Sequence, residues 1–324
     1  MEIMRKRFFL AALAAIMGTA IAVAQQIAVV SESGSSDLYQ TLAKAIEGAD
    51  PGSTIYLPGG RFAIADSVKI SKKLTIIGIG HYLNGEGNED GYTRIEGNLW
   101  FNEGSSSSAV MGCYMTGDVN IGEGDASVND VVIRYCNLNS VQVKNSTCSG
   151  TTVNQNYVRG VSRFGYSNNV TISNNIVYLI QYVGSGFIRN NVVTRSAGDA
   201  FYQVNNCVIS GNIIRLLSYM HSGSGCAIDN NLVVGGSWGD NPIIIDATEE
   251  ECFENLNGWT VSPLSNFHFK SEHSQYEHQV GIYAGSGFSD KQLAPVPYIV
   301  DKQVASETDA SGKLNIKIRV KASE

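Results

Sequence analysis

The 324-residue chain lacks several features by which broad protein classes are recognised. No cysteine precedes Cys113, so none stands just after an N-terminal export signal to carry a lipid anchor. The six cysteines form no Cys-x-x-Cys pair, which argues against redox or zinc chemistry. After residue 24, no apolar run is long enough to span a bilayer. We therefore expect neither a metal site nor stable membrane insertion.

Acidic residues are scarce in the middle of the chain. Residues 131–228 hold seven basic residues and one acidic residue, Asp199, for a formal charge of +6. Residues 25–130 hold 6 basic and 14 acidic residues, and residues 229–324 hold 7 and 14. A basic band in an acidic protein predicts a polyanionic partner. The same scarcity disfavours a glycoside hydrolase, which usually needs a pair of carboxylates.

A short sequence phrase recurs through the second third of the chain. It consists of an aliphatic residue, two polar or small residues, an asparagine and further aliphatic residues. The asparagines are separated by 19, 16, 21 and 19 residues, and they are Asn156, Asn175, Asn191, Asn212 and Asn231. A repeat near 20 residues with short β-like runs indicates a solenoid, in which stacked coils bury a common core. Further matches on both sides, including Cys113 and Cys136 in the asparagine position, predict about ten or eleven coils.

The recurring asparagine has a structural explanation. Stacked on copies of itself, its amide can donate a hydrogen bond to one neighbour and accept one from the other. We therefore predict an asparagine ladder and assign no chemistry to these residues.

The start of the repeat region gives the family resemblance. An apolar helix pattern over Leu42–Ile46 is followed by the turn Pro51-Gly52 and the short apolar runs Ile55–Leu57 and Leu74–Gly78. This order resembles the opening of the right-handed parallel β-helix family, whose best-known members are the pectate-lyase-like proteins. The resemblance implies an all-β, right-handed parallel β-helix solenoid with an N-terminal capping helix. The fold hosts several activities as well as non-enzymes, so it does not fix the function.

The chain divides into four predicted parts. Residues 1–24 have the basic start, apolar stretch and small-residue cleavage site of a secretory signal peptide. Residues 25–52 form a lead-in and capping helix, the latter over 36–48 with Ser36 or Asp37 as N-cap. Residues 53–248 form the β-helix, and 249–324 a C-terminal cap and strand-rich tail. Segments 281–285 and 295–300 resemble the closing part of secreted β-helix proteins from Bacteroidetes. We expect export to the periplasm, cell surface or medium.

Two pairs of cysteines are predicted to stack between neighbouring coils. Cys207 and Cys226 are 19 residues apart at the same position of successive repeats, and Cys113 and Cys136 also share a position. Neighbouring strands are close enough for a disulfide, but a buried cysteine also packs as a small apolar residue. Free thiols and disulfides both stay open, with free thiols favoured.

Two further columns follow the ladder asparagines at fixed offsets. Such columns offer flat rings for stacking on sugars and guanidinium forks for carboxylates. The first column holds Arg159, Tyr178, Thr194, Arg215 and Val234, and the second holds Lys144, Arg163, Tyr182, Asp199, Tyr219 and Trp238. The candidate binding residues are Arg159, Tyr182, Asp199, Arg215, Tyr219 and Trp238. The alternative is that the aromatic residues point inward.

Three functional hypotheses remain. The first is a non-catalytic module that binds an acidic polysaccharide, a likelier ligand than nucleic acid for an exported protein. The second is a polysaccharide lyase in which Lys144, Arg163 or Arg195 serves as base or neutralises the uronide carboxylate, with calcium as cofactor in that case alone. The catalytic signature of the pectate lyases is absent, so the lyase ranks second. The third is a structural spacer. The sequence leaves the glycan and the oligomeric state open.

Overall fold

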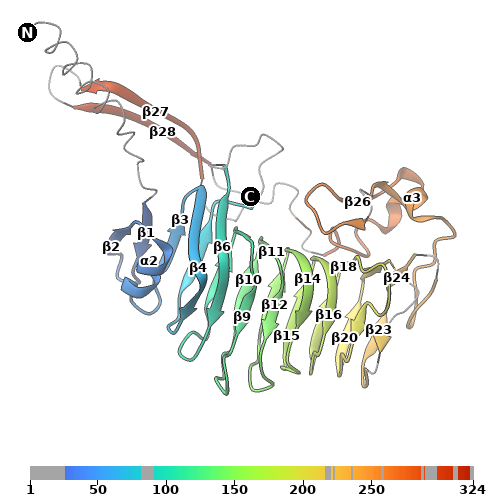
Figure 1. Ribbon diagram of the computed structural model, residues 1–324. Coiled ribbons are helices and arrows are strands. Elements are labelled where there is room, and N and C mark those ends of the chain that lie inside the picture. Colours follow the sequence, from blue (N-terminus) through green and yellow to red (C-terminus); the bar gives the residue numbers. More distant parts are fainter. Residues whose placement is uncertain are drawn as a thin grey trace, which may run out of the picture.

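The computed structural model describes residues 26–81, 91–215, 220–221, 223–234, 236–256, 259–285, 288, 298–308 and 313–321. The predicted signal peptide and Tyr219 lie outside the described residues. The chain winds into a rod of stacked coils that runs from the N-terminal strands to β24 (Figure 1). The architecture is a parallel β-solenoid, and the predicted all-β solenoid is confirmed.

One face of the rod is a sheet of short parallel strands, here called sheet A. Nine of its strands stack in parallel and bound eight complete turns, which is fewer than the predicted ten or eleven. The prediction was too high because Ile95 lies on another face of the second coil, and because Ile243 makes only an isolated bridge. The nine strands are β3 (Thr54–Leu57), β5 (Thr75–Gly78), β7 (Ala109–Met111), β10 (Val132–Arg134), β13 (Thr152–Asn154), β15 (Val170–Ser173), β17 (Gly186–Arg189), β20 (Cys207–Ser210) and β23 (Ala227–Asp229).

The second sheet, sheet B, has two limbs joined by a bend. Four longer strands pass through both limbs: β4 (Gly60–Ile70), β6 (Thr93–Phe101), β14 (Tyr157–Arg163) and β16 (Ile176–Gln181). The register shifts in the middle of β4 and β14, where the bend lies. The first limb adds β8 (Tyr114–Met115), β11 (Asn137–Leu138), β18 (Val192–Val193), β21 (Ile213–Ile214) and β24 (Leu232–Val233). The second limb adds β9 (Val119–Ile121), β12 (Val141–Val143), β19 (Phe201–Tyr202) and β22 (Met220–His221).

The interior of the rod is a column of aliphatic side chains. Each of the first eight parallel strands of sheet A contributes a central residue that is at most 2% exposed: Ile55, Ile76, Val110, Ile133, Val153, Ile172, Ile188 and Ile209. These residues pair directly with one another in the parallel register. A single coil could not bury them, so the core exists only because the coils stack.

The asparagine ladder is confirmed. The five ladder asparagines are 0% exposed, and the Nδ2 of each of the first four donates to the Oδ1 of the next asparagine at 2.9–3.0 Å. Each Nδ2 also donates to two backbone carbonyls, as Asn191 does to Ile172 and Arg189. The left-handed backbone conformation falls on the preceding residue, as at Asn174 (φ 53°) and Asn190 (φ 58°), rather than on the ladder residue itself.

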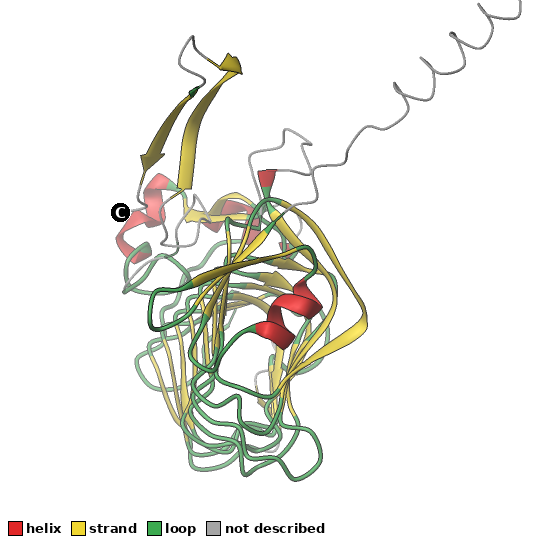
Figure 2. Ribbon diagram, turned by 90° about the vertical axis from the view of Figure 1, so that its left-hand side faces the viewer, coloured by secondary structure: helices red, strands yellow, loops and turns green. Residues whose placement is uncertain are grey.

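The N-terminal end of the rod is closed by a hairpin and a helix. Strand β1 (Ile27–Val30) pairs antiparallel with β3 and with β2 (Ser36–Tyr39). Helix α2 (Leu42–Gly48) begins after the N-cap Thr41, whose hydroxyl accepts from Lys44 N–H. The predicted start near residue 36 was wrong because these residues pair with β1 instead. The helix lies at the near end of the rod in Figure 2.

The C-terminal segment packs beside the coils rather than continuing them. It contains α3 (Glu249–Cys252), β25 (Phe253–Asn255), β26 (Asn266–Phe269) and the 3₁₀ helix η3 (Ser271–Tyr276). Its buried residues, among them Phe253, Val280 and Ile282, form one cluster with the outward-facing apolar residues of the first limb. These residues are Tyr157, Ile176, Val192, Ile213 and Leu232. A separate hairpin pairs β27 (Tyr298–Thr308) with β28 (Leu314–Lys321), which confirms the strand predicted at 314–320 (Figure 1).

All six cysteines are free thiols. Cys136 takes the ladder position, and its backbone N–H donates to Asn156 Oδ1 at 2.9 Å. Burial raises the pKa of the Cys136 and Cys207 thiols to about 12. These thiols therefore act as small apolar groups that extend the core. In the described part of the chain, no helix is long and apolar enough to cross a membrane.

Candidate functional site

The outer face of the second limb carries a continuous row of polar and aromatic side chains. We call it the outer row, and in register order it consists of Lys69, Trp100, Asn120, Gln142, Arg163, Gln181 and Tyr202. The residues alternate along their strands with core residues such as Leu99, Val119 and Val141, all 0% exposed. Since neighbouring strands lie about 4.8 Å apart, the five steps from Trp100 to Tyr202 span roughly 24 Å.

Two cations of this face have no acidic partner. The Lys144 ammonium lies 5.3 Å from the centroid of the Trp100 ring, and Arg163 is exposed one coil further along. Among the residues that the structure describes, no carboxylate lies within ion-pair distance of either one. Lys69, at the N-terminal end of the row, differs because it pairs with Glu123 at 2.6 Å. The middle of the row therefore presents net positive charge.

Two amide side chains lie between Trp100 and Arg163 in the row. Asn120 is 4% exposed and Gln142 is at the 9% level. Gln142 Nε2 donates to Ser140 Oγ and to the Val161 carbonyl, both at 2.8 Å. Within the described chain, no donor reaches Gln142 Oε1 and no hydrogen bond engages the Asn120 amide. The amides thus offer donors and acceptors in the same row as the cations.

Three tyrosine rings contact one another in tilted and edge-on arrangements beside the C-terminal part of the row. The Tyr166 and Tyr182 ring centroids are 5.4 Å apart, and those of Tyr182 and Tyr202 are 5.6 Å apart. Tyr166 and Tyr182 both have a φ of 59° in the turn that follows their strands. Tyr166 is 43% exposed, and its hydroxyl bonds to Gln203. We call Tyr166, Tyr182 and Tyr202 the tyrosine ladder. Its rings provide aromatic surface next to Arg163.

The structure brings together Lys144, Arg163 and Tyr182 from the predicted residues. The residues of the predicted first column each directly follow a paired residue of the first limb, so this column lies on the first limb. There Arg215 contacts the cap, with its Nε 3.5 Å from Glu249 and its guanidinium 5.7 Å from the Trp259 ring. Arg159 is partly buried beside Tyr114 and donates to the Met115 carbonyl at 2.8 Å. These two arginines are separate from the outer row.

Three other predicted residues, Arg195, Asp199 and Trp238, lie at the corner or end of the rod. Arg195 folds over its own loop, where its Nη1 donates to the Asp199 carbonyl at 2.8 Å. Trp238 packs against the core and stacks on Phe201, with ring centroids 5.6 Å apart and an interplanar angle of 19°. Trp238 therefore points inward, as the alternative interpretation of the aromatic residues expected. Tyr219 is outside the described residues.

Sequence analysis missed Trp100, Gln142, Tyr166 and Tyr202. The predicted columns lie at a fixed number of residues after each ladder asparagine, but the bend between the limbs changes length from coil to coil. The outer row follows the ladder asparagine by 7 residues at Arg163, by 6 at Gln181 and by 11 at Tyr202. A fixed offset therefore cannot follow the second limb. The second apolar alternation in each coil, such as Val141 and Val143, is the signal that would have located it.

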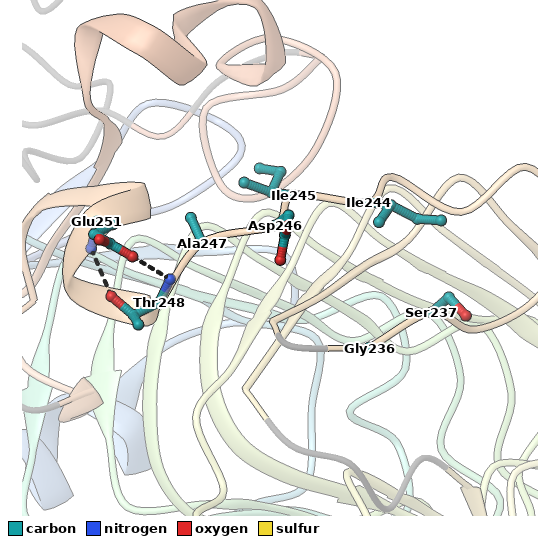
Figure 3. Close-up of a pocket in the computed structure, with 8 residues that line it drawn as sticks. All are labelled: Gly236, Ser237, Ile244, Ile245, Asp246, Ala247, Thr248 and Glu251. Carbon is teal, nitrogen blue, oxygen red and sulfur yellow. Dashed lines mark hydrogen bonds between the residues drawn. The ribbon is translucent and has the colours of Figure 1, made fainter.

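An open depression of about 740 Å³ lies near the last coil (Figure 3). None of the predicted site residues line it. Glu251 on its wall forms a capping box with Thr248, and these hydrogen bonds lower the pKa of Glu251. This carboxylate therefore has a structural role in starting α3. Across the described ranges, no group of three or more His, Cys, Asp or Glu residues could hold a metal ion.

Comparison of the chain with known protein families, with curated proteins and with solved structures finds no match. The resemblance to pectate-lyase-like proteins therefore reaches as far as the parallel β-solenoid itself.

Proposed function

We propose that this protein is an exported β-solenoid that binds an acidic polysaccharide along the outer row of the second limb. The observation that carries the proposal is the pairing of uncompensated Lys144 and Arg163 with Trp100 and the tyrosine ladder on one exposed face. Carboxylates of a uronate polymer would bind the two cations, and sugar rings would stack on the aromatic faces. The basic start and apolar stretch of residues 1–24 support export.

The geometry suits a chain-like ligand better than a small one. The outer row is a line of roughly 24 Å, and its side chains change from ring to amide to cation along that line. A linear polymer can contact each of these groups with successive sugar units. Charge contributes a salt-dependent attraction, while the rings and amides select for a sugar polymer over other polyanions.

A lyase is the second candidate, and one observation favours it. Lys144 and Arg163 extend from neighbouring strands of the same face, so one could neutralise a uronide carboxylate while the other removes the adjacent proton. Binding ranks ahead of elimination because it needs only the exposed cations and rings. Calcium would enter only with the lyase hypothesis.

The test is to incubate the mature protein with a panel of polyuronates and glycosaminoglycans, with and without calcium. Affinity gels measure retardation, and ultraviolet absorbance measures unsaturated uronide. We expect retardation by at least one polyuronate and no new absorbance. New absorbance that disappears in Lys144→Ala or Arg163→Ala would establish the lyase instead. The absence of both signals for every polymer would leave a structural spacer.

A further inference from the structure

The outer face of the first limb changes character along the rod. From Tyr157 onward, the outward-facing residues of the first limb are apolar and pack against the C-terminal cap. Before Tyr157, the same register positions hold Arg94, Tyr114 and Asn137. Arg94 and Tyr114 belong to the segment whose sequence is acidic overall, and the fold brings them next to the basic segment 131–228.

Two guanidinium groups flank the ring of Tyr114. Arg159 lies 4.9 Å from the ring centroid and Arg94 lies 5.6 Å from it. Arg94 Nε is 3.0 Å from Glu96, a carboxylate that it shares with Arg61. Arg159 donates only to neutral oxygens, the side chain of Asn137 and the Met115 carbonyl. Among the described residues, no carboxylate pairs with Arg159 although it is partly buried.

A buried histidine without a partner lies next to this cluster. His81 is 2% exposed, and its ring meets Tyr157 edge-on at a centroid distance of 5.3 Å. Within the part of the chain that the structure describes, neither ring nitrogen has a hydrogen-bond partner. Burial, with a smaller contribution from the charge of Arg159, lowers the pKa of His81 to about 3, so the ring is neutral. A neutral imidazole carries one N–H that has no acceptor here.

Among the described residues, Arg159 lacks a carboxylate partner and His81 lacks a hydrogen-bond acceptor. A partly buried guanidinium without a carboxylate is unfavourable, and so is a buried N–H without an acceptor. Arg159 has five N–H donors and uses only two of them on Asn137 and Met115. A carboxylate supplies negative charge and two acceptor oxygens, and it therefore satisfies both groups at once.

We infer that the carboxylate of a sugar acid binds beside Tyr114, where it accepts hydrogen bonds from Arg159 and from His81. This site lies on the first limb, while the proposed polysaccharide face lies on the second. The site is separate from the outer row, while the choice of a sugar acid as its ligand rests on the proposed function. Glu96 holds Arg94 at the edge of the site, so Arg94 contributes long-range attraction rather than a free fork.

The test follows the ring of His81 by NMR in protein labelled with ¹⁵N-histidine. Sodium galacturonate should shift the His81 ring signals in a saturable way, while the methyl ester of galacturonic acid, which lacks the charge, should not. Arg159→Gln should weaken galacturonate binding at least tenfold. Arg189→Gln is the matched control, since it removes an exposed cation of sheet A outside both proposed sites, and it should leave this titration unchanged.

A second variant covers the case in which Arg159→Gln fails to fold. His81→Phe keeps a buried ring against Tyr157 and removes the donor, and calorimetry should show galacturonate binding at least tenfold weaker. Unshifted His81 signals at saturating galacturonate would overturn the inference, as would equal binding of the methyl ester. Arg159→Gln should still be retarded in polyuronate gels, so failure of this site and failure of the outer row are distinguishable.

Discussion

The inner ladder and the outer row are both polar columns built by the same coils, but they differ in hydrogen bonding. In the ladder, the same residue recurs and its amide is satisfied within the protein, as at Asn191, which makes five hydrogen bonds. In the outer row the residue type changes at each step, and Lys144 and Arg163 lack ionic partners in the described chain. A polar group that the fold satisfies has a structural role, and one that the fold leaves unsatisfied on an exposed face is available to a ligand.

The largest expected effect comes from breaking the ladder. Asn191→Ala removes hydrogen bonds to both neighbouring coils, leaves the Asn175 N–H without its acceptor and takes one donor from each of the Ile172 and Arg189 carbonyls. We expect the free energy of unfolding to fall by about 3–5 kcal/mol. Urea denaturation followed by circular dichroism measures it.

Asn168→Ala is the matched control for the ladder variant. Asn168 is exposed, and its side chain has one contact, from Ser185 Oγ at 3.1 Å. We expect a loss below about 1 kcal/mol. Equal losses in the two variants would show that the ladder has no special role in stability.

The next effect is a pH dependence that comes from His81. Its folded pKa of about 3 lies below the unfolded value of 6.5, so the unfolded state binds the proton first as the pH falls. The contribution of His81 to the free energy of unfolding is complete above pH 6.5 and is lost progressively as the pH falls toward 3. Between pH 6.5 and 4.5 the loss is about 2 kcal/mol. His81→Phe should remove this part of the acid sensitivity in urea titrations, whereas the exposed His278→Asn should retain it.

Charge on the outer row should matter for binding and little for stability. Lys144→Gln combined with Arg163→Gln should weaken polyuronate binding about tenfold, or roughly 1.4 kcal/mol. The salt dependence of the affinity should also decrease. Arg189→Gln is the control, because Arg189 is equally exposed but stacks on Phe187 on sheet A. If Arg189→Gln weakens binding as much, the attraction comes from overall charge rather than from the outer row.

The smallest effect is expected from one ring of the tyrosine ladder. Tyr182→Asn removes the central ring while asparagine tolerates the left-handed backbone at this position. Loss of one stacking surface should weaken polyuronate binding about threefold. Tyr135→Asn is a close control, since Tyr135 also has a positive φ (53°) but lies beside Arg134 on another turn. Calorimetric titration of both variants should show a change only for Tyr182→Asn.

The ladder and the stacked coils could be predicted because they depend on local repetition. Each ladder asparagine follows its sheet A strand at a constant distance, so the register of Asn156 with Asn175 and Asn191 can be read along the chain. The second limb could not be predicted in the same way. The bend before it varies in length, and this variation separates Arg163 from Asp199 although both were placed in one column.

The ends of the rod also depend on tertiary contacts. Ser36–Tyr39 has the composition of a helix start. In the structure these residues instead form backbone hydrogen bonds with β1, which itself pairs with β3. A helix over the same residues could not make these bonds. Leu38 is 61% exposed as a result. Trp238 follows the same rule at the other end, where stacking on Phe201 buries a ring that its sequence position alone leaves undecided.

Oxidative footprinting with mass spectrometry tests the central claim most directly. The protein is exposed to hydroxyl radicals with and without the polyuronate that retards it best, and the modification of each aromatic residue is measured. The account predicts that the polymer protects Trp100, Tyr166, Tyr182 and Tyr202, while Phe187 and Tyr135 keep their reactivity. Protection of Phe187 and Tyr135 with unchanged Trp100 and Tyr182 would place the polymer on sheet A and contradict the account.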